Sequence, residues 1–191
     1  MKLELVRKEV DALYHSNYTN ADPWIVWAYP NHVLFVAKTA ERIAVKHGAN
    51  KEFCIAGALL HDIADVVMNR FTQGHAEESL RIADEVLAKC GYTDRDRNFI
   101  VNEIIYPHSC SHTMPTSVEG KVVATADAMA HLQTDFFLYF AWQHYGGKDL
   151  ESLKQWVLTK IEKHYHTKIF FDDCREEVQP EYKALKLLFS K

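Results

Sequence analysis

The sequence predicts an all-α protein, a compact helical bundle, on three observations. Apolar residues recur at three- and four-residue spacing along most of the chain, which is the period of an amphipathic helix. Capping residues precede several of these segments, and glycine or proline follows them. The alternation typical of strands is scarce, and KIFF at residues 168–171 is the only short candidate.

The first helices are predicted from their apolar stripes. Residues 1–15 mix charged and apolar side chains as an amphipathic helix does. Residues 31–47 carry one apolar stripe followed by Gly48, and residues 76–90 carry another followed by Gly91. Glycine commonly follows a helix because it adopts the left-handed conformation without steric cost, so both glycines mark expected helix ends.

Residues 51–67 are apolar nearly all round, and such a helix belongs at the centre of a fold. Three later helices are expected from their capping residues: one from Thr93 and Asp94 to Ile105, one from Ser117 through Met129, and one from Asp149 through Ile161. The chain has no internal repeat and no linker rich in glycine, serine or proline. We therefore expect one domain spanning residues 1–191.

Composition and charge narrow the class of partner. The 191 residues are 48% hydrophobic and 25% charged, which is ordinary for a soluble globular protein. The net charge is −4, from 22 basic and 26 acidic residues, and no stretch is dense in lysine and arginine. Surfaces that coat nucleic acids are normally basic, so we expect no nucleic acid polymer as a partner.

The compartment is predicted from segments that the sequence lacks. No stretch reaches the roughly 18 uninterrupted apolar residues of a membrane span, and the first helix has no apolar signal-peptide core. The cysteines are far apart, without a CxxC pair, as is typical of reduced thiols; they are Cys54, Cys90, Cys110 and Cys174. We expect a cytoplasmic protein with no membrane partner.

The most informative stretch is GALLHDIADVV at residues 57–67, which places His61 and Asp62 inside an apolar run. A buried aspartate costs several kcal/mol unless it is paired or bound to a cation. Asp127 interrupts another apolar helix, and His32 lies beside the stripe of residues 31–47. These four groups would leave no charge unpaired if they converged on one divalent cation.

The alternative gives each group a separate partner. His61 would be a core histidine bonded to the backbone, and each aspartate would cap a helix or pair with an arginine. Arg42 and Arg70 are the candidates, and neither falls in an apolar stripe.

The order of these residues resembles the HD-domain superfamily of metal-dependent phosphohydrolases. Four phrases carry the resemblance: NHVLFVAKTA, GALLHDIAD, GHAEESLRIADEVL and EGKVVATADAMAHL. It implies a helical core at about residues 25–135 with a helical extension at 136–191. The implied metal ligands are His32, His61, Asp62 and Asp127.

Two further histidines fall where some members of this superfamily place a second metal. His75 and His108 would bind that second metal or contact the substrate. The donor set suits Mn, Fe, Co, Ni, Zn or Mg, bound as one ion or two. The other histidines are read as surface or packing residues; apart from the weaker candidate His112, these are His15, His47, His131, His144, His164 and His166.

The resemblance also assigns catalytic roles to Asp65, His61 and Asp62. Nucleotidase members are similar to this chain in carrying an acid at the position of Asp65, where it handles the proton of the attacking water. A solvated carboxylate near a helix end is the alternative for Asp65. Lys121 and Arg70 are the expected contacts for the substrate phosphate.

The expected activity is metal-dependent hydrolysis of a phosphate ester or phosphoanhydride in a small metabolite, with a nucleotide preferred. The chain lacks the HDIGK and GYP features of cyclic-dinucleotide phosphodiesterases of this type. A di-iron oxygenase and a binding or signalling module remain as alternatives. The aromatic stretch DFFLYFAWQHY at residues 135–145 is expected in the core or at a subunit contact, which leaves a homodimer open.

Overall fold

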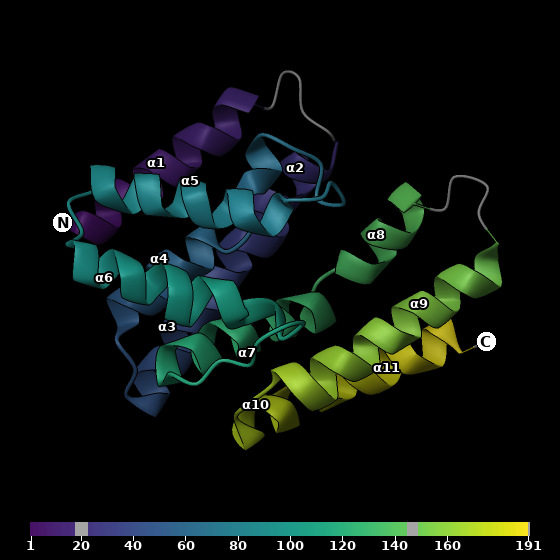
Figure 1. The fold of residues 1–191 in the computed structure, drawn as a ribbon. Coiled ribbons are helices and arrows are strands. Elements are labelled where there is room, and N and C mark those ends of the chain that lie inside the picture. The colour runs from purple at the N-terminus through teal and green to yellow at the C-terminus, as the bar shows by residue number, and fades with distance from the viewer. Residues whose placement is uncertain (18–22, 145–148, 191) are drawn as a thin grey trace.

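A computed structural model describes residues 1–17, 23–144 and 149–190, and these residues are folded almost entirely into helices (Figure 1). Its α-helices, and its shorter 3₁₀ and π turns labelled η, are in chain order α1 (Lys2–Asn17), α2 (Pro23–Ala28), η2 (Tyr29–Val33), α3 (Leu34–His47), α4 (Lys51–Leu60), η3 (Ile63–Val66), α5 (His75–Lys89), α6 (Asp94–Phe99), η4 (Ile100–Ile105), η5 (Tyr106–Ser109), α7 (Val118–Gln133), α8 (Phe136–His144), α9 (Leu150–Lys163), η6 (His164–Lys168), α10 (Asp172–Glu177) and α11 (Gln179–Phe189). None of the described residues forms a strand, so the predicted all-α class is confirmed.

The predicted helix ends have the expected local chemistry. Gly48 and Gly91 both follow a helix with positive φ, at 69° and 82°. Thr93, Ser117 and Asp149 each accept a hydrogen bond from a backbone N–H in the first turn of the next helix. The KIFF stretch forms no strand, because Lys168 ends η6 and the residues after it are irregular.

The continuous helix predicted over residues 51–67 is wrong in its second half. α4 ends at Leu60, Asp62 leaves the helical region with φ −128° and ψ 33°, and a short 3₁₀ turn follows. Ile63 beyond the break is as buried as the residues before it. An apolar pattern reports burial, and because burial continues across this break, the pattern does not indicate where the helix ends.

α4 lies at the centre of the fold, in contact with α1, α3, η4 and α7. α7 in turn contacts η6 and α11, while α9 packs beside α11 (Figure 1). α3 and α4 thus meet the carboxyl-terminal helices at α7, and buried apolar residues from Val6 to Phe189 form one contiguous core.

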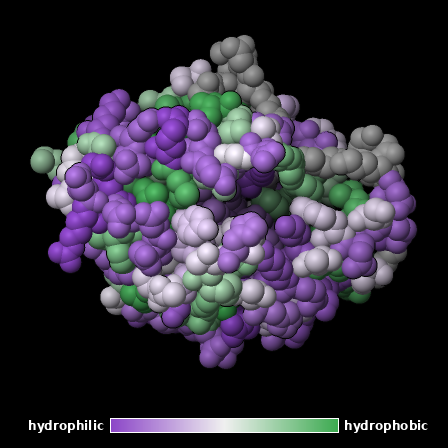
Figure 2. Space-filling model, in the orientation of Figure 1, coloured by the Kyte–Doolittle hydropathy of each residue, from purple (hydrophilic) through white to green (hydrophobic). Residues whose placement is uncertain are grey.

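The face seen in Figure 2 is mostly hydrophilic, with apolar residues in small groups. Among the residues that the structure describes, no helix is both long and apolar enough to cross a membrane. Each of the four cysteines is a buried free thiol.

Gly57 lets α4 pack closely against η4. A Cβ atom built on Gly57 would lie 2.6 Å from Cγ2 of Ile104, which is fully buried. This close approach matters for the pocket, because α4 runs into His61 and η4 runs toward His108.

We therefore expect Gly57→Ala to destabilise the protein by about 1–3 kcal/mol, the usual range for overpacking a core. Urea unfolding followed by circular dichroism measures the change. The cost should shrink in an Ile104→Ala background, because that substitution removes the clashing methyl group. An equal cost in both backgrounds would show that contact with Ile104 is not its source.

Candidate metal centre and its pocket

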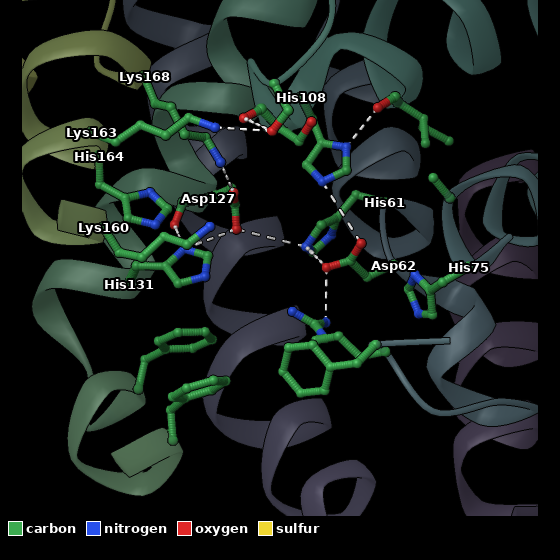
Figure 3. A pocket seen from close by; sticks show the side chains of 18 of the residues that line it. His61, Asp62, His75, His108, Asp127, His131, Lys160, Lys163, His164 and Lys168 are labelled. Carbon is green, nitrogen blue, oxygen red and sulfur yellow. Dashed lines mark hydrogen bonds and ion pairs between the residues drawn. The ribbon is translucent and has the colours of Figure 1, made fainter. Parts of the chain in front are cut away.

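A pocket of about 370 Å³ opens between α7, η5, α8 and α9, within the usual size range of small-molecule sites. One side carries His61, Asp62 and His108, and the opposite side carries lysines from α9 and η6 (Figure 3). Asp127 lies between these two sides (Figure 3). The pocket therefore joins residues from the motif-bearing core to residues from the carboxyl-terminal helices.

Three of the predicted ligands form a fully buried cluster. The Nε2 atom of His32 lies 3.3 Å from Nε2 of His61 and 3.3 Å from Oδ1 of Asp127. The Nε2 atom of His61 lies 3.8 Å from the same oxygen of Asp127. η2, the end of α4 and the middle of α7 supply these side chains, so the convergence predicted from sequence is present in the fold.

A second group of ligand atoms adjoins the first through His61. Its Nε2 atom lies 3.5 Å from Oδ2 of Asp62, and Nε2 of His108 lies 3.7 Å from Oδ1 of Asp62. Asp62 thus lies between the two imidazoles. Both His75 and His108 are predicted to bind a second metal or to contact the substrate, and the structure brings His108 to this group, whereas Nε2 of His75 bonds to Asp65.

The backbone orients both imidazoles toward the centre. Nδ1 of His61 is 2.8 Å from the carbonyl oxygen of Ala58, and Nδ1 of His108 is 2.6 Å from that of Ile105. A carbonyl only accepts hydrogen bonds, so Nδ1 carries the proton in each ring and the Nε2 lone pair faces the carboxylates.

Burial keeps the flanking imidazoles neutral. It lowers the pKa of His32 to about 3 and that of His108 to about 4, although nearby aspartates act in the opposite direction. A neutral imidazole offers a lone pair to a metal, whereas a protonated one offers none. At neutral pH these two rings are therefore available as ligands.

The donor set fits one divalent cation. Ligand atoms about 2.1 Å from a shared ion and roughly 90–110° apart lie about 3.0–3.4 Å from one another. The separations among His32, His61 and Asp127 are 3.3, 3.3 and 3.8 Å, close to that range. Oδ1 of Asp127 is buried and makes no hydrogen bond within the described part of the chain. An ion between these atoms would satisfy that oxygen.

Arg70 neutralises two carboxylates, that of half-buried Asp62 and that of buried Asp65. Its Nη2 atom donates to Oδ2 of Asp62 at 2.8 Å and to Oδ2 of Asp65 at 2.6 Å. Burial raises the pKa of both carboxyls, but Arg70 and the neighbouring histidines together more than offset it, so both pKa values lie below their usual range. The ring of Trp24 lies 4.8 Å from the guanidinium carbon and covers the pair.

Asp65 lies behind this arginine and is not a solvated carboxylate. Its side chain is fully buried and accepts from Arg70, from Nε1 of Trp24 at 3.1 Å, and from Nε2 of His75 at 2.8 Å. Asp65 is not among the residues that line the pocket, whereas His75 and Arg70 are. Any effect of Asp65 on a bound molecule therefore passes through His75 or Arg70.

The two basic residues expected to contact phosphate have different positions. Arg70 lines the pocket, and Lys121 does not. Lys121 follows the cap of α7, whereas Asp127 and His131 lie further along the same helix. Lys160, Lys163 and Lys168 line the pocket instead, and the sequence analysis missed them. The basic run TKIEKHYHTK was the signal that could have revealed them.

Two histidines that were assigned to the surface or to packing also line the pocket. His131 lies one turn after Asp127 on α7, with Nδ1 3.2 Å from Oδ1 of that aspartate. His164 stacks on His131, with ring centroids 4.2 Å apart. The four-residue spacing from Asp127 was the available signal for His131. The side chain of His144 lies outside the described residues.

A separate group of possible ligand atoms joins His47, Asp173 and Cys174. Lys46 already pairs with Asp173 at 2.5 Å, and the ring of His47 stacks on Phe171. Burial raises the pKa of the Cys174 thiol to about 11, so it stays protonated at neutral pH. Because a metal needs the thiolate, this group is a poor metal site.

The family model of the HD domain matches residues 29–132. The chain belongs to the HD-domain family. HD domains bind divalent metals, and the His/Asp cluster is the place where this HD domain brings suitable ligand atoms together.

Two curated relatives share part of this HD domain. A protein named Ribonuclease Y from Fusobacterium nucleatum subsp. nucleatum is 31% identical over 99 residues, which cover 52% of this chain and 18% of the relative. A Ribonuclease Y from Campylobacter hominis is 30% identical over 99 residues, which cover 52% of this chain and 17% of the relative. The match therefore spans less than a fifth of each relative. No solved structure gives a significant match.

We expect Arg70→Met to destabilise the HD domain by about 3–5 kcal/mol at pH 7, the usual cost of leaving buried charges unpaired. With Arg70 present, the lowered pKa of Asp65 gives stability that is held above pH ~4 and lost as the pH falls. Without Arg70 the buried carboxyls protonate more readily. The difference in free energy of unfolding between the unmodified protein and Arg70→Met, measured by urea unfolding, should therefore shrink toward pH 4.

The matched control is Arg81→Met. Arg81 also binds two carboxylates, Glu78 and Glu85, but on the exposed face of α5. Its loss should change stability little at either pH, because exposed ion pairs contribute little. A similar loss for both variants would contradict a special role for Arg70.

Proposed function

We propose that this HD domain hydrolyses a phosphate ester or phosphoanhydride of a small, nucleotide-like metabolite. The observation that carries this proposal is the cluster of His32, His61 and Asp127, joined through His61 to Asp62, beside a pocket whose opposite wall is basic. A cation site beside a basic wall suits a phosphorylated substrate, because both attract phosphate oxygens. Membership of the HD-domain family supports the same reaction class.

A divalent cation held by this cluster would lower the pKa of a bound water and offset negative charge that develops on phosphorus. The side chains of the cluster are already oriented to hold such a cation. His61 presents Nε2 because its Nδ1–H is held by Ala58, and Asp62 lies between His61 and His108. His108 is thus placed either to complete a second ligand set or to contact the substrate.

Arg70 is the proposed phosphate ligand on the cation side of the pocket. Its Nε and Nη2 atoms bond to Asp65 and Asp62, which fixes the guanidinium plane. Its Nη1 atom has no partner among the described residues, and the side chain lines the pocket. A fixed guanidinium with free N–H groups favours phosphate oxygens over neutral groups.

The proposed path for the proton of the attacking water runs through His75 to Asp65. His75 lines the pocket, and its Nε2 lies 2.8 Å from Oδ1 of Asp65. A buried carboxylate orients an imidazole and stabilises it when it takes up a proton. Asp65 acts in this proposal as the positioning residue, and His75 as the residue that faces the substrate.

The pocket also has an aromatic side that suits a base. Phe136, Phe140 and Trp156 line it, and Phe140 stacks on Trp156 with ring centroids 4.4 Å apart. Flat apolar surfaces of this kind bind aromatic rings. This wall favours a nucleotide over a sugar phosphate in the proposal.

The names of the two relatives supply a second candidate, hydrolysis of RNA. We propose a small substrate in place of RNA, because a protein with a net charge of −4 does not favour binding of a long anionic polymer. A short RNA therefore belongs beside nucleotides and sugar phosphates in the substrate screen. Faster cleavage of RNA than of every small ester would replace the small-metabolite proposal.

We expect phosphate or pyrophosphate release that is abolished by a chelator and restored by Mn, Co, Ni or Mg. Asp62→Ala should remove bound metal and activity together, as measured by elemental analysis and phosphate release. Asp172→Ala is the control, because Asp172 pairs with Arg175 on the surface. In ¹⁸O-labelled water the released phosphate should gain label if that water attacks phosphorus. Full metal content and turnover in Asp62→Ala would contradict the assignment.

The di-iron oxygenase alternative predicts a different outcome of the same experiment. It requires two bound irons, stoichiometric oxygen consumption and no phosphate release across the screen. A binding or signalling module would bind metal or nucleotide without turnover.

We expect Asp65→Asn to retain the metal but to lower kcat by about 10²-fold or more, the usual contribution of general acid–base catalysis. Asparagine preserves the shape of the side chain but removes the charge that would stabilise protonated His75. The pH dependence of kcat should therefore change along with its magnitude. An unchanged profile with reduced metal content would instead assign Asp65 a purely structural role.

A further inference from the structure

Three lysines line one wall of the pocket, opposite the cation side (Figure 3). Lys160 and Lys163 are three residues apart on α9, so they project from one face of that helix. Lys168 follows at the end of η6 and reaches Asp127. The carboxyl-terminal helices, which carry no recognised motif, thus supply the basic side of the pocket.

The charges on this wall are not balanced. The ammonium of Lys168 is paired with Asp127, and Arg70 is paired with Asp62 and Asp65. Lys160 and Lys163 form no ion pair with a carboxylate of the described residues. Lys160 lies 5.3 Å from the centre of the Trp156 ring, and Lys163 donates to Oγ of Ser111 at 2.9 Å. Two positive charges are therefore left unneutralised beside the cation site.

The lysine charges act on one another. Both side chains are half-buried, and burial together with the charge of Lys168 lowers the pKa of Lys160 and that of Lys163. A fully solvated lysine would extend into water and avoid both the burial of its charge and the repulsion from its neighbours. An anion placed between the ammonium groups removes the repulsion, which is the usual arrangement at phosphate sites.

Two serines add hydroxyl groups next to the lysines. Ser109 ends η5, Ser111 follows it, both line the same pocket, and Ser111 already accepts from Lys163. The Ser111 hydroxyl also donates to the carbonyl oxygen of Ser109 at 3.4 Å, a long bond that a phosphate oxygen would replace while Ser111 still accepts from Lys163. The pocket therefore places serine hydroxyls next to the ammonium group of Lys163.

We propose that Lys160 and Lys163, together with Ser111, bind a second phosphate group of the substrate, beyond the one held at the His/Asp cluster. The substrate class is then a compound with a chain of two or more phosphates, such as a nucleoside diphosphate or triphosphate. A monophosphate would leave the two lysines unneutralised. This inference deepens the proposed hydrolase function and uses the same pocket.

Binding of inorganic triphosphate and of inorganic phosphate tests this inference without turnover. The full chain is titrated in a calorimeter with excess EDTA and at constant ionic strength, so that metal binding by the probe plays no part. We expect triphosphate to bind at least about tenfold more tightly than phosphate, because only the longer anion reaches both Arg70 and the lysines of α9.

The decisive variant is Lys160→Met with Lys163→Met, which keeps the apolar stems. It should weaken triphosphate binding about tenfold or more and remove the advantage of triphosphate over phosphate. The control is Lys154→Met with Lys183→Met, which makes the same change in net charge. Lys154 pairs with Glu151 and Lys183 bonds to Gln179, and neither lines the pocket. This control should bind triphosphate like the unmodified protein.

The double variant Lys160→Arg with Lys163→Arg should retain triphosphate binding, and circular dichroism should show the same helix content in every variant. Equal binding of triphosphate and phosphate, or an equal loss in the control, would overturn the inference. If triphosphate binds as expected but no phosphate ester is hydrolysed, the site stands and the hydrolase proposal fails. If hydrolysis occurs without any dependence on Lys160 and Lys163, the hydrolase proposal stands and the site fails.

Discussion

The placement of three carboxylates in a helical core, half-buried Asp62 and buried Asp65 and Asp127, is the constraint on which this structure depends. An unpaired buried carboxylate costs several kcal/mol, and each of these three is paired with a basic side chain. Arg70 serves the first two and Lys168 the third. The segment that carries Arg70 and the turn that carries Lys168 are thus fixed by charge as well as by packing.

The same constraint explains how the carboxyl-terminal helices join the motif-bearing core. Besides the bond from Lys168 to Asp127, Oγ1 of Thr125 donates to the backbone carbonyl of Lys168 and accepts from the N–H of Phe170 at 3.0 Å. These bonds anchor η6 to the middle of α7. Once η6 is anchored, the end of α9 must lie along the pocket, and its lysines form the basic wall.

The break after α4 has a comparable effect on the other side. In a straight helix, consecutive side chains point about 100° apart and would contact different parts of the protein. Here the chain leaves the helix at Asp62, and His61 and Asp62 belong to one cluster. His61 faces His32 and Asp127, while Asp62 faces Arg70 and His108. The two residues thereby connect the buried ligands to the open pocket.

The sequence by itself determined the helical class, most helix ends and the inward placement of His32, His61 and Asp127, because apolar periodicity and capping are local signals. It could not show that α4 breaks at Asp62, since burial continues across the break. It also missed Lys160, Lys163 and Lys168, and it favoured Lys121, because a lysine's sequence context does not reveal which pocket its ammonium reaches. Only the tertiary structure decided that, since charge pairing across long sequence separations, such as Asp127 with Lys168, fixes the distant segments against one another.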